Sequence, residues 1–87
     1  MTSRQEIVEQ VRAIAAKETG IPVEELTPDL DLRKVAGVDS VKVLRVVARI
    51  ERDHDIELSD EQVFAFATVS DVADAVVEAL RTADAAP

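Results

Sequence analysis

The helical spacing of the apolar residues is the feature that most constrains how this chain can fold. Ile7, Val11 and Ile14 fall at i, i+4 and i+7, which places them on one face of a helix. Similar apolar faces return in two later segments, and no strand-like alternation is sustained. With 87 residues the chain has room for one modest core. We therefore expect a single all-α domain over residues 1–87, with a frayed tail at residues 83–87.

Four helices are expected, because a capping residue precedes each helical stretch. Ser3 and Ser59 each stand three residues ahead of a Glu or a Gln, which is the spacing of a capping box. The sequence thus predicts a small four-helix bundle with three longer helices and one short helix. Its elements are a helix from about Ser3 to Thr19, a helix from Asp39 to Asp55, a short helix after Ser59 with Val63, Phe64 and Phe66, and a last helix capped by Ser70 whose buried face is Val72, Ala73, Val76, Val77 and Leu80.

The connection between the first two long helices, Ile21 to Val38, shows no sustained period. Its 18 residues exceed the usual length of a loop. Either it contains a short helical turn, or it is a long loop held down by its leucines. We favour the pinned loop, because a mobile one would leave those leucines in water.

Composition excludes several classes of protein. There is no Cys, so disulfides, thiolate metal sites and a cysteine nucleophile are absent. A single histidine, His54, cannot form a multi-histidine zinc site, and we expect no metal. A net charge of −8 and only two aromatic residues argue against nucleic-acid binding. We expect those two, Phe64 and Phe66, to anchor the core, because no other bulky residue is available.

No segment of the sequence is typical of secretion or membrane insertion. The longest uninterrupted apolar run is Val63 to Ala67, which is far too short to cross a bilayer. The N-terminal residues are polar and lack the apolar stretch of a signal peptide. We therefore expect a cytoplasmic protein without a membrane partner, present as a monomer.

Ser40 is the candidate modification site. The other serines stand directly before helical runs, where capping explains them, whereas Asp39 already occupies the expected cap next to Ser40. Ser40 then lies in the first turn of a helix, where unpaired amides and the helix dipole favour a phosphate group. The alternative is that Ser40 is merely tolerated in that turn or shares the cap with Asp39.

Catalysis by Ser40 is not expected, since a serine nucleophile needs a nearby base. The single histidine, His54, follows fourteen positions later on the same helix, which is about 21 Å away. We expect His54 to pack at the helix end, where its imidazole is compatible with the negative dipole. The chain is therefore predicted not to be an enzyme.

A row of cations follows Ser40 at helical spacing. Residues 33–52 hold 2 acidic and 6 basic residues, although the chain as a whole is acidic. The row is either a solvated surface or a docking surface, and we favour docking because like charges at this spacing cost helix stability. We call it the basic stripe; it consists of Lys42, Arg45, Arg49 and Arg52.

The segment Gly37–Val41, read Gly-Val-Asp-Ser-Val, resembles the phosphopantetheine attachment motif of acyl carrier proteins, usually Gly-x-Asp-Ser-Leu. The resemblance covers nearly the whole chain. A Glu-Glu-Leu-Thr-Pro stretch follows the first helix at Glu24 to Pro28, and an acidic turn at Ile56 to Glu61 precedes the short helix.

This resemblance implies a function. Ser40 would be modified by a phosphopantetheinyl transferase that uses coenzyme A, and the 4′-phosphopantetheine cofactor would carry acyl groups as thioesters. Asp39 would help position the transferase, and Val41 would seat the base of the arm. The other implied partners are acyl-transferring and condensing enzymes, namely an acyltransferase or ligase and a ketosynthase.

Two departures from the family pattern bear on the pathway. Val41 stands where leucine is usual, and Lys42 and Arg45 replace acidic positions on the face that fatty-acid carriers present to basic partner enzymes. We therefore expect Lys42, Arg45 and Arg49 to bias the choice of partner. The pathway expected is polyketide or other specialised biosynthesis rather than primary fatty-acid synthesis.

Two other functions remain open at the level of sequence. The first is a carrier of aminoacyl, peptidyl or D-alanyl groups on the same fold; peptidyl carriers more often show Gly-Gly-x-Ser, while D-alanyl carriers share the Asp-Ser pair. The second belongs to another class, a helical protein-interaction module whose Ser40 carries nothing.

Overall fold

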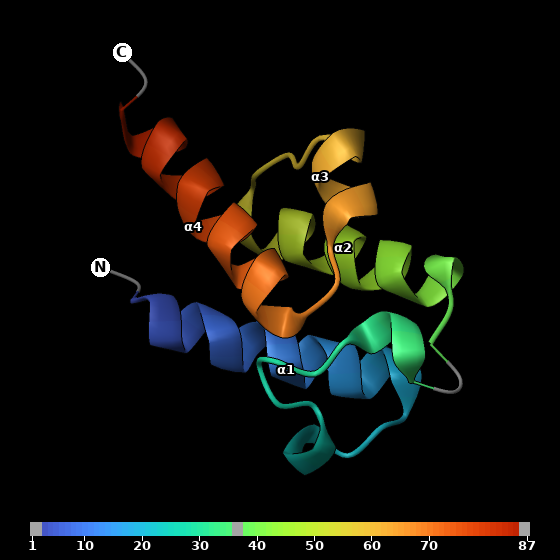
Figure 1. Cartoon of the computed structure of the whole chain (residues 1–87). Coiled ribbons are helices and arrows are strands. Elements are labelled where there is room, and N and C mark those ends of the chain that lie inside the picture. The colour runs from blue at the N-terminus through green and yellow to red at the C-terminus, as the bar shows by residue number, and fades with distance from the viewer. Residues whose placement is uncertain (1–2, 36–37, 86–87) are drawn as a thin grey trace.

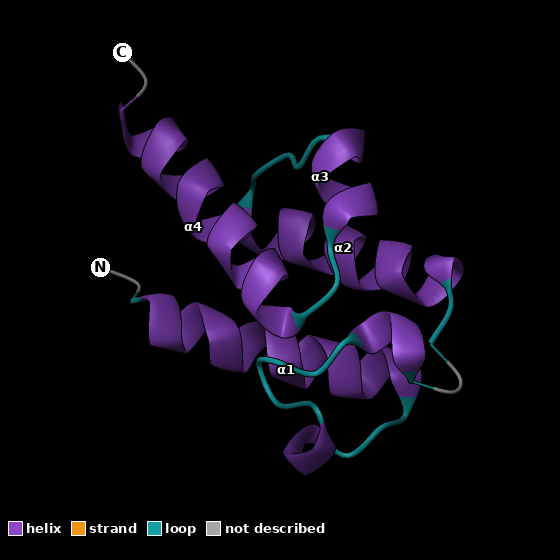
Figure 2. Ribbon diagram, in the orientation of Figure 1, coloured by secondary structure: helices purple, strands orange, loops and turns teal. Residues whose placement is uncertain are grey.

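The predicted helical bundle is confirmed by a computed structural model, which describes residues 3–35 and 38–85. Those residues form helices, short helical turns and loops, with no strand among them (Figure 2). The helices shown in Figure 1 are α1 (Arg4–Thr19), α2 (Ser40–His54), α3 (Asp60–Ala65) and α4 (Val69–Ala85).

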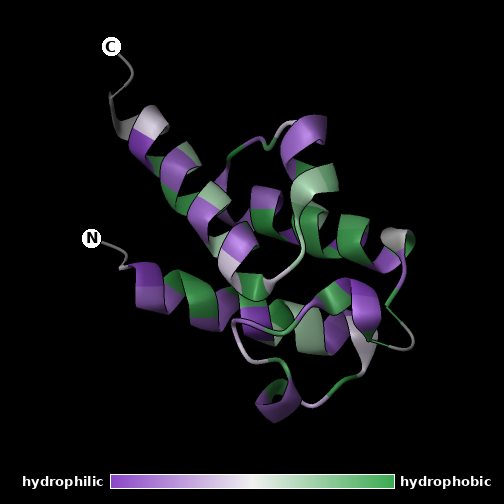
Figure 3. Cartoon of the chain, in the orientation of Figure 1, coloured by the Kyte–Doolittle hydropathy of each residue, from purple (hydrophilic) through white to green (hydrophobic). Residues whose placement is uncertain are grey.

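Helix α1 is the centre of the bundle, because it packs against both α2 and α4. Hydrophobic and hydrophilic bands alternate along each long helix (Figure 3), as burial of one face requires. On α4 the predicted buried face is confirmed, with Val72, Ala73 and Val76 buried and two further residues half-buried. The core also includes Ile7, Val8, Val11 and Ala15 of α1 and Val46, Val47 and Ile50 of α2.

Three of the predicted caps are confirmed. The Ser3 hydroxyl accepts a hydrogen bond from the Glu6 amide at 3.2 Å and donates one to the Glu6 carboxylate at 3.3 Å. The Asp39 carboxylate accepts a hydrogen bond from the amide of Lys42, the third residue of α2. Ser59 and Gln62 form the complete capping box, in which each side chain accepts from the other residue's amide.

The prediction that Ser70 caps the last helix is wrong. Helix α4 begins at Val69, and the Thr68 hydroxyl accepts from the Asp71 amide at 3.1 Å. The Asp71 carboxylate in turn accepts from the amides of Ala67 and Thr68, at 2.9 and 3.2 Å. Ser70 therefore lies inside the first turn, where amides have no acceptor within the helix, and its amide donates to the Pro28 carbonyl at 3.1 Å.

The last helix also ends later than predicted. It continues through Ala85, so residues 83–85 of the expected tail are helical, while residues 86–87 lie outside the described residues. Residues 81–85 contain neither Gly nor Pro, so no helix breaker interrupts the last turn.

The connection between α1 and α2 combines the two alternatives that the sequence left open. It contains two short 3₁₀ turns, η1 (Val23–Glu25) and η2 (Leu32–Lys34), so the helical turn that we disfavoured is present. It is also pinned, as predicted, because Leu26 is fully buried and the Leu32 amide donates to the Ala67 carbonyl at 2.7 Å. In Figure 1 the connection runs below α1 at η1 and then crosses in front of α1 to η2.

The prediction that both phenylalanines anchor the core is wrong for Phe64. Phe66 is half-buried and packs against the core, whereas the Phe64 side chain is 86% exposed. Val63 of α3 and Phe66, the residue that follows the helix, pack against the core, whereas Phe64 points away from it. Valine, alanine, isoleucine and leucine fill the core instead.

Candidate functional site

Ser40 is the first residue of α2, and Asp39 caps that helix. The Asp39 carboxylate accepts a hydrogen bond from the Lys42 amide at 2.9 Å, and the Asp39 carbonyl accepts one from the Val43 amide at 3.1 Å. Asp39 thus supplies the cap, and Ser40 stands at the positive end of the helix dipole. Gly37 and the Ser40 side chain lie outside the described part of the structure.

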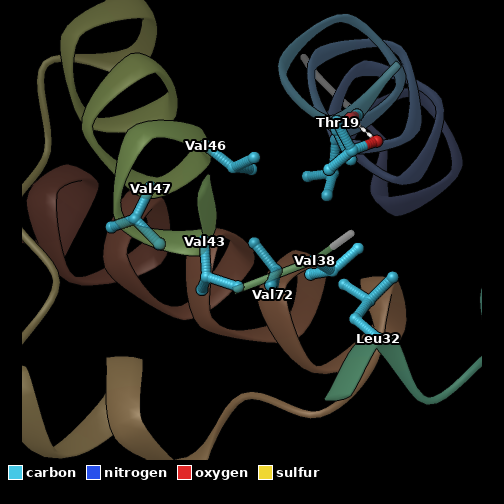
Figure 4. A pocket seen from close by; sticks show the side chains of 9 residues that line it. Thr19, Leu32, Val38, Val43, Val46, Val47 and Val72 are labelled. Atoms are coloured by element: carbon cyan, nitrogen blue, oxygen red, sulfur yellow. Dashed lines mark hydrogen bonds between the residues drawn. The ribbon is translucent and has the colours of Figure 1, made fainter. Parts of the chain in front are cut away.

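A narrow apolar cavity of about 20 Å³ lies between α1, α2 and α4 (Figure 4). Two of its lining residues, Val38 and Val43, stand shortly before and after Ser40 in the sequence. The Thr19 hydroxyl in its wall donates to the Ala15 carbonyl of its own helix at 2.7 Å. A cavity of this size holds roughly one water molecule, so a longer apolar chain enters only if the walls separate. Its lining is Val11, Ala15, Thr19, Leu32, Val38, Val43, Val46, Val47 and Val72.

A larger groove of about 290 Å³ lies between the first half of α2 and α3. It begins beside Ser40, since Val38, Asp39 and Val43 line it, and Leu44 and Phe64 extend it across the two helices. The groove is mostly apolar, with the charged side chains of Asp39 and Arg33 among its lining residues. An elongated group attached at Ser40 therefore has a partly apolar channel next to its anchor.

The turn η2, which contributes Leu32 to both the cavity and the groove, is held by Asp31 and Arg33. The Asp31 carboxylate accepts from the Arg33 amide at 3.0 Å and from the Arg33 guanidinium at 3.0 and 3.1 Å. Those bonds hold the pKa of the Asp31 carboxyl below its usual value. Sequence reasoning missed this pair, although an Asp two residues before an Arg at a turn is a recognisable signal.

The other predicted residues lie on the outer side of α2. Val41 is 55% exposed, directly after Ser40. In the basic stripe, the three arginines are exposed, as the spacing predicts, whereas Lys42 is half-buried. Among the described residues, one stripe member is in an ion pair, Arg49 with Asp53 at 3.4 Å.

His54 is at the far end of α2 from Ser40, as expected. Its Nε2 lies 2.8 Å from the Gln10 side-chain oxygen on α1, so it joins two helices rather than serving Ser40. In the described ranges, no group of three or more His, Asp or Glu residues is arranged to hold a metal ion. None of the described helices is long and apolar enough to cross a membrane.

Comparison with known proteins gives two findings. Residues 9–76 match the family model described as a phosphopantetheine attachment site, a span that includes Asp39 and Ser40. The chain is also similar to an acyl carrier protein of Saccharopolyspora erythraea, with 33% identity over 86 residues. That alignment covers 95% of this chain and 90% of the relative.

Proposed function

This chain belongs to the acyl carrier protein family, and from that premise we propose that Ser40 is the residue that carries its 4′-phosphopantetheine arm. The family makes the protein a carrier rather than a catalyst and makes 4′-phosphopantetheine its cofactor. The observation that carries the assignment of Ser40 is its position as the first residue of α2, directly after the capping Asp39.

The residues around Ser40 fit such a group. A phosphodiester there is stabilised by the positive end of the α2 dipole. The partly apolar groove beside Ser40 offers the arm a surface with both apolar and charged lining residues. When bound, the arm supplies a terminal thiol that holds acyl groups as thioesters, which this chain without Cys could not supply itself.

Asp39 and Val41 have separate roles in this proposal. Asp39 fixes the first turn of α2 through its bond to the Lys42 amide and thereby presents Ser40 to the transferase. Val41 is the exposed residue after Ser40 and seats the base of the arm. Asp39 is itself exposed, so a partner enzyme can contact it.

The proposed partners are a phosphopantetheinyl transferase, an acyltransferase or ligase that loads the arm, and a ketosynthase that extends the cargo. The basic stripe supports a pathway in polyketide or other specialised biosynthesis, with Lys42, Arg45 and Arg49 at the docking surface. Exposed cations attract acidic surfaces and speed their association. Changing these three residues to Glu is expected to impair turnover with the native partner, and unchanged kinetics at low salt contradict the docking role.

Intact-mass measurement tests the modification site. The purified chain is incubated with coenzyme A and a broad-specificity phosphopantetheinyl transferase, and the protein is then weighed. We expect one mass gain that is lost in Ser40→Ala and kept in Ser59→Ala, a matched change of a capping serine on α3. No gain under conditions that modify a control carrier instead supports an unmodified interaction module.

A further inference from the structure

Arg33 is a cation in the wall of the groove that begins beside Ser40. It belongs to the turn η2 rather than to the basic stripe, and its side chain is 68% exposed. Among the described residues that line the groove, the charged side chains are those of Arg33 and Asp39. An arm that lies in this groove therefore meets one cation there, and it comes from the first connection of the bundle.

The Arg33 side chain is oriented by Asp31. The Asp31 carboxylate accepts from Nε and Nη2 of Arg33 at 3.0 and 3.1 Å, which is a two-bond geometry that fixes the plane of the guanidinium. The turn that carries both residues is itself anchored, because the Leu32 amide donates to the Ala67 carbonyl at 2.7 Å. The guanidinium is thus oriented before any arm is attached.

The pair leaves hydrogen-bond donors of Arg33 available. A guanidinium carries five N–H groups, and within the described ranges the side chain of Arg33 uses two of them, both toward Asp31. The N–H groups of Nη1 are among those that remain for a ligand in the groove. The hydrogen bond to Asp31 and the negative charges of Asp31 and Asp71 raise the pKa of the guanidinium, so it stays charged.

A phosphodiester on Ser40 needs a cation near it. Asp39 is the preceding residue and lines the groove with an exposed carboxylate, so two negative groups would stand next to each other. The positive end of the α2 dipole offsets part of that repulsion. A guanidinium offsets more of it, because its planar N–H groups match the oxygens of a phosphate and form charge-assisted hydrogen bonds.

We propose that Arg33 binds the phosphodiester of the arm by donating from its guanidinium to the phosphate oxygens, and that Asp31 is the positioning residue for Arg33. The contact rests on the proposed function, since it requires the arm at Ser40. It ties the base of the arm to η2 and so gives the first connection a role in orienting the arm. Because the contact exists only when the arm is attached, Arg33 contributes more to the stability of the arm-bearing form than to that of the unmodified chain.

Phosphorus NMR of the arm-bearing full chain tests the contact. The chain is modified with coenzyme A and the transferase, and intact mass confirms one arm before each spectrum. We expect the phosphodiester resonance of Arg33→Gln to be shifted from that of the parent, and the difference to shrink at high salt because the pair is exposed. Lys34→Gln is the matched control, since it removes the same charge from the next exposed residue of η2, which does not line the groove. Its resonance should coincide with that of the parent.

Urea denaturation separates binding of the arm from a purely structural role. Parent and variants are unfolded with and without the arm, which gives a thermodynamic cycle for each changed residue. We expect Arg33→Gln to raise the unfolding equilibrium constant of the arm-bearing form about threefold more than that of the unmodified chain, the size of an exposed ion pair. Lys34→Gln should change both forms equally. Circular dichroism checks that each variant keeps its helices.

Two outcomes overturn the proposal. One is equal destabilisation of the two forms by Arg33→Gln, which leaves Arg33 only its bond to Asp31. The other is the same phosphorus shift in Arg33→Gln and Lys34→Gln, which reduces the effect to general charge. If Arg33→Gln does not fold, Arg33→Lys replaces it and should give smaller changes of the same sign, because it keeps the charge without the planar N–H groups; no change overturns the proposal. A parent chain that gains no mass refutes the assignment of Ser40, whereas an arm-bearing chain that is indifferent to Arg33 refutes this contact alone.

Discussion

The Arg12 guanidinium Nε lies 2.8 Å from the carbonyl oxygen of Leu26 and donates a hydrogen bond to it. Its Nη2 donates to the carbonyl of Val23, also at 2.8 Å, and its Nη1 bonds the Glu9 carboxylate. One side chain of α1 thus satisfies two carbonyls of a connection that has little regular structure. This explains how the connection holds Leu26 in the core.

Replacing Arg12 should therefore destabilise the fold more than replacing an exposed arginine. Arg12→Ala leaves two loop carbonyls without their donor, and we expect a loss of about 2 kcal/mol in the free energy of unfolding. Arg4→Ala removes an exposed ion pair with Asp74 and should cost less than about 1 kcal/mol. Urea denaturation measures both, and equal losses would show that Arg12 contributes no more than a surface charge.

Asp39 should matter both for stability and for modification. Asp39→Ala removes the cap of α2 and should cost about 1 kcal/mol, while Asp39→Asn retains a good cap and should cost much less. Ser59→Ala, which uncaps α3 instead, is the matched control. We expect Asp39→Ala, but not Ser59→Ala, to slow arm attachment at Ser40, as followed by intact mass. Equal slowing in both variants would show that the effect comes from general destabilisation.

The two hydroxyls near the start of α4 should respond differently to alanine. Thr68→Ala removes the acceptor for the Asp71 amide and should cost about 1 kcal/mol. Ser70→Ala changes a first-turn residue whose hydroxyl, among the described residues, accepts only a long bond from Arg4 at 3.5 Å, and should fall within about 0.5 kcal/mol of the parent. Thermal or urea unfolding measures the stability lost in each variant. A larger loss for Ser70→Ala than for Thr68→Ala would show that Ser70 caps the helix.

Acid should reveal the pairing of Asp31 with Arg33. The pKa of the Asp31 carboxyl is lowered in the folded chain, chiefly by its side-chain hydrogen bonds to Arg33. Between the usual pKa and the lowered one, the unfolded chain binds a proton that the folded chain does not, so stability falls as the pH falls through that window. Asp31→Asn removes this contribution.

The measurement for Asp31 is the free energy of unfolding as a function of pH. The parent should lose more stability than Asp31→Asn on acidification below about pH 4. Because the pair is solvent-exposed, the difference should shrink at high salt. Parallel pH profiles for the two proteins would show that the pair does not contribute to stability.

Much of the helical pattern could be predicted because it depends on short-range chemistry. The caps at Ser3, Asp39 and Ser59 involve partners three residues away, within one turn of backbone. Ser70 was misassigned because Thr68, two residues before it, makes the same kind of short-range exchange with Asp71, while the Ser70 amide donates to the distant Pro28 carbonyl. Phe64 was misassigned because the side that a short helix buries depends on its neighbours.

The sequence by itself determined the all-helical class, the start of α2 at the Asp39–Ser40 pair and the basic stripe, since helix period and capping are local properties. Only the tertiary structure decided that Leu32, Val38 and Val43 meet beside Ser40, and that Leu44 and Phe64 share one exposed groove. Those contacts join residues from separate elements. Their packing depends on how the connections cross the bundle, which no local period of the sequence specifies.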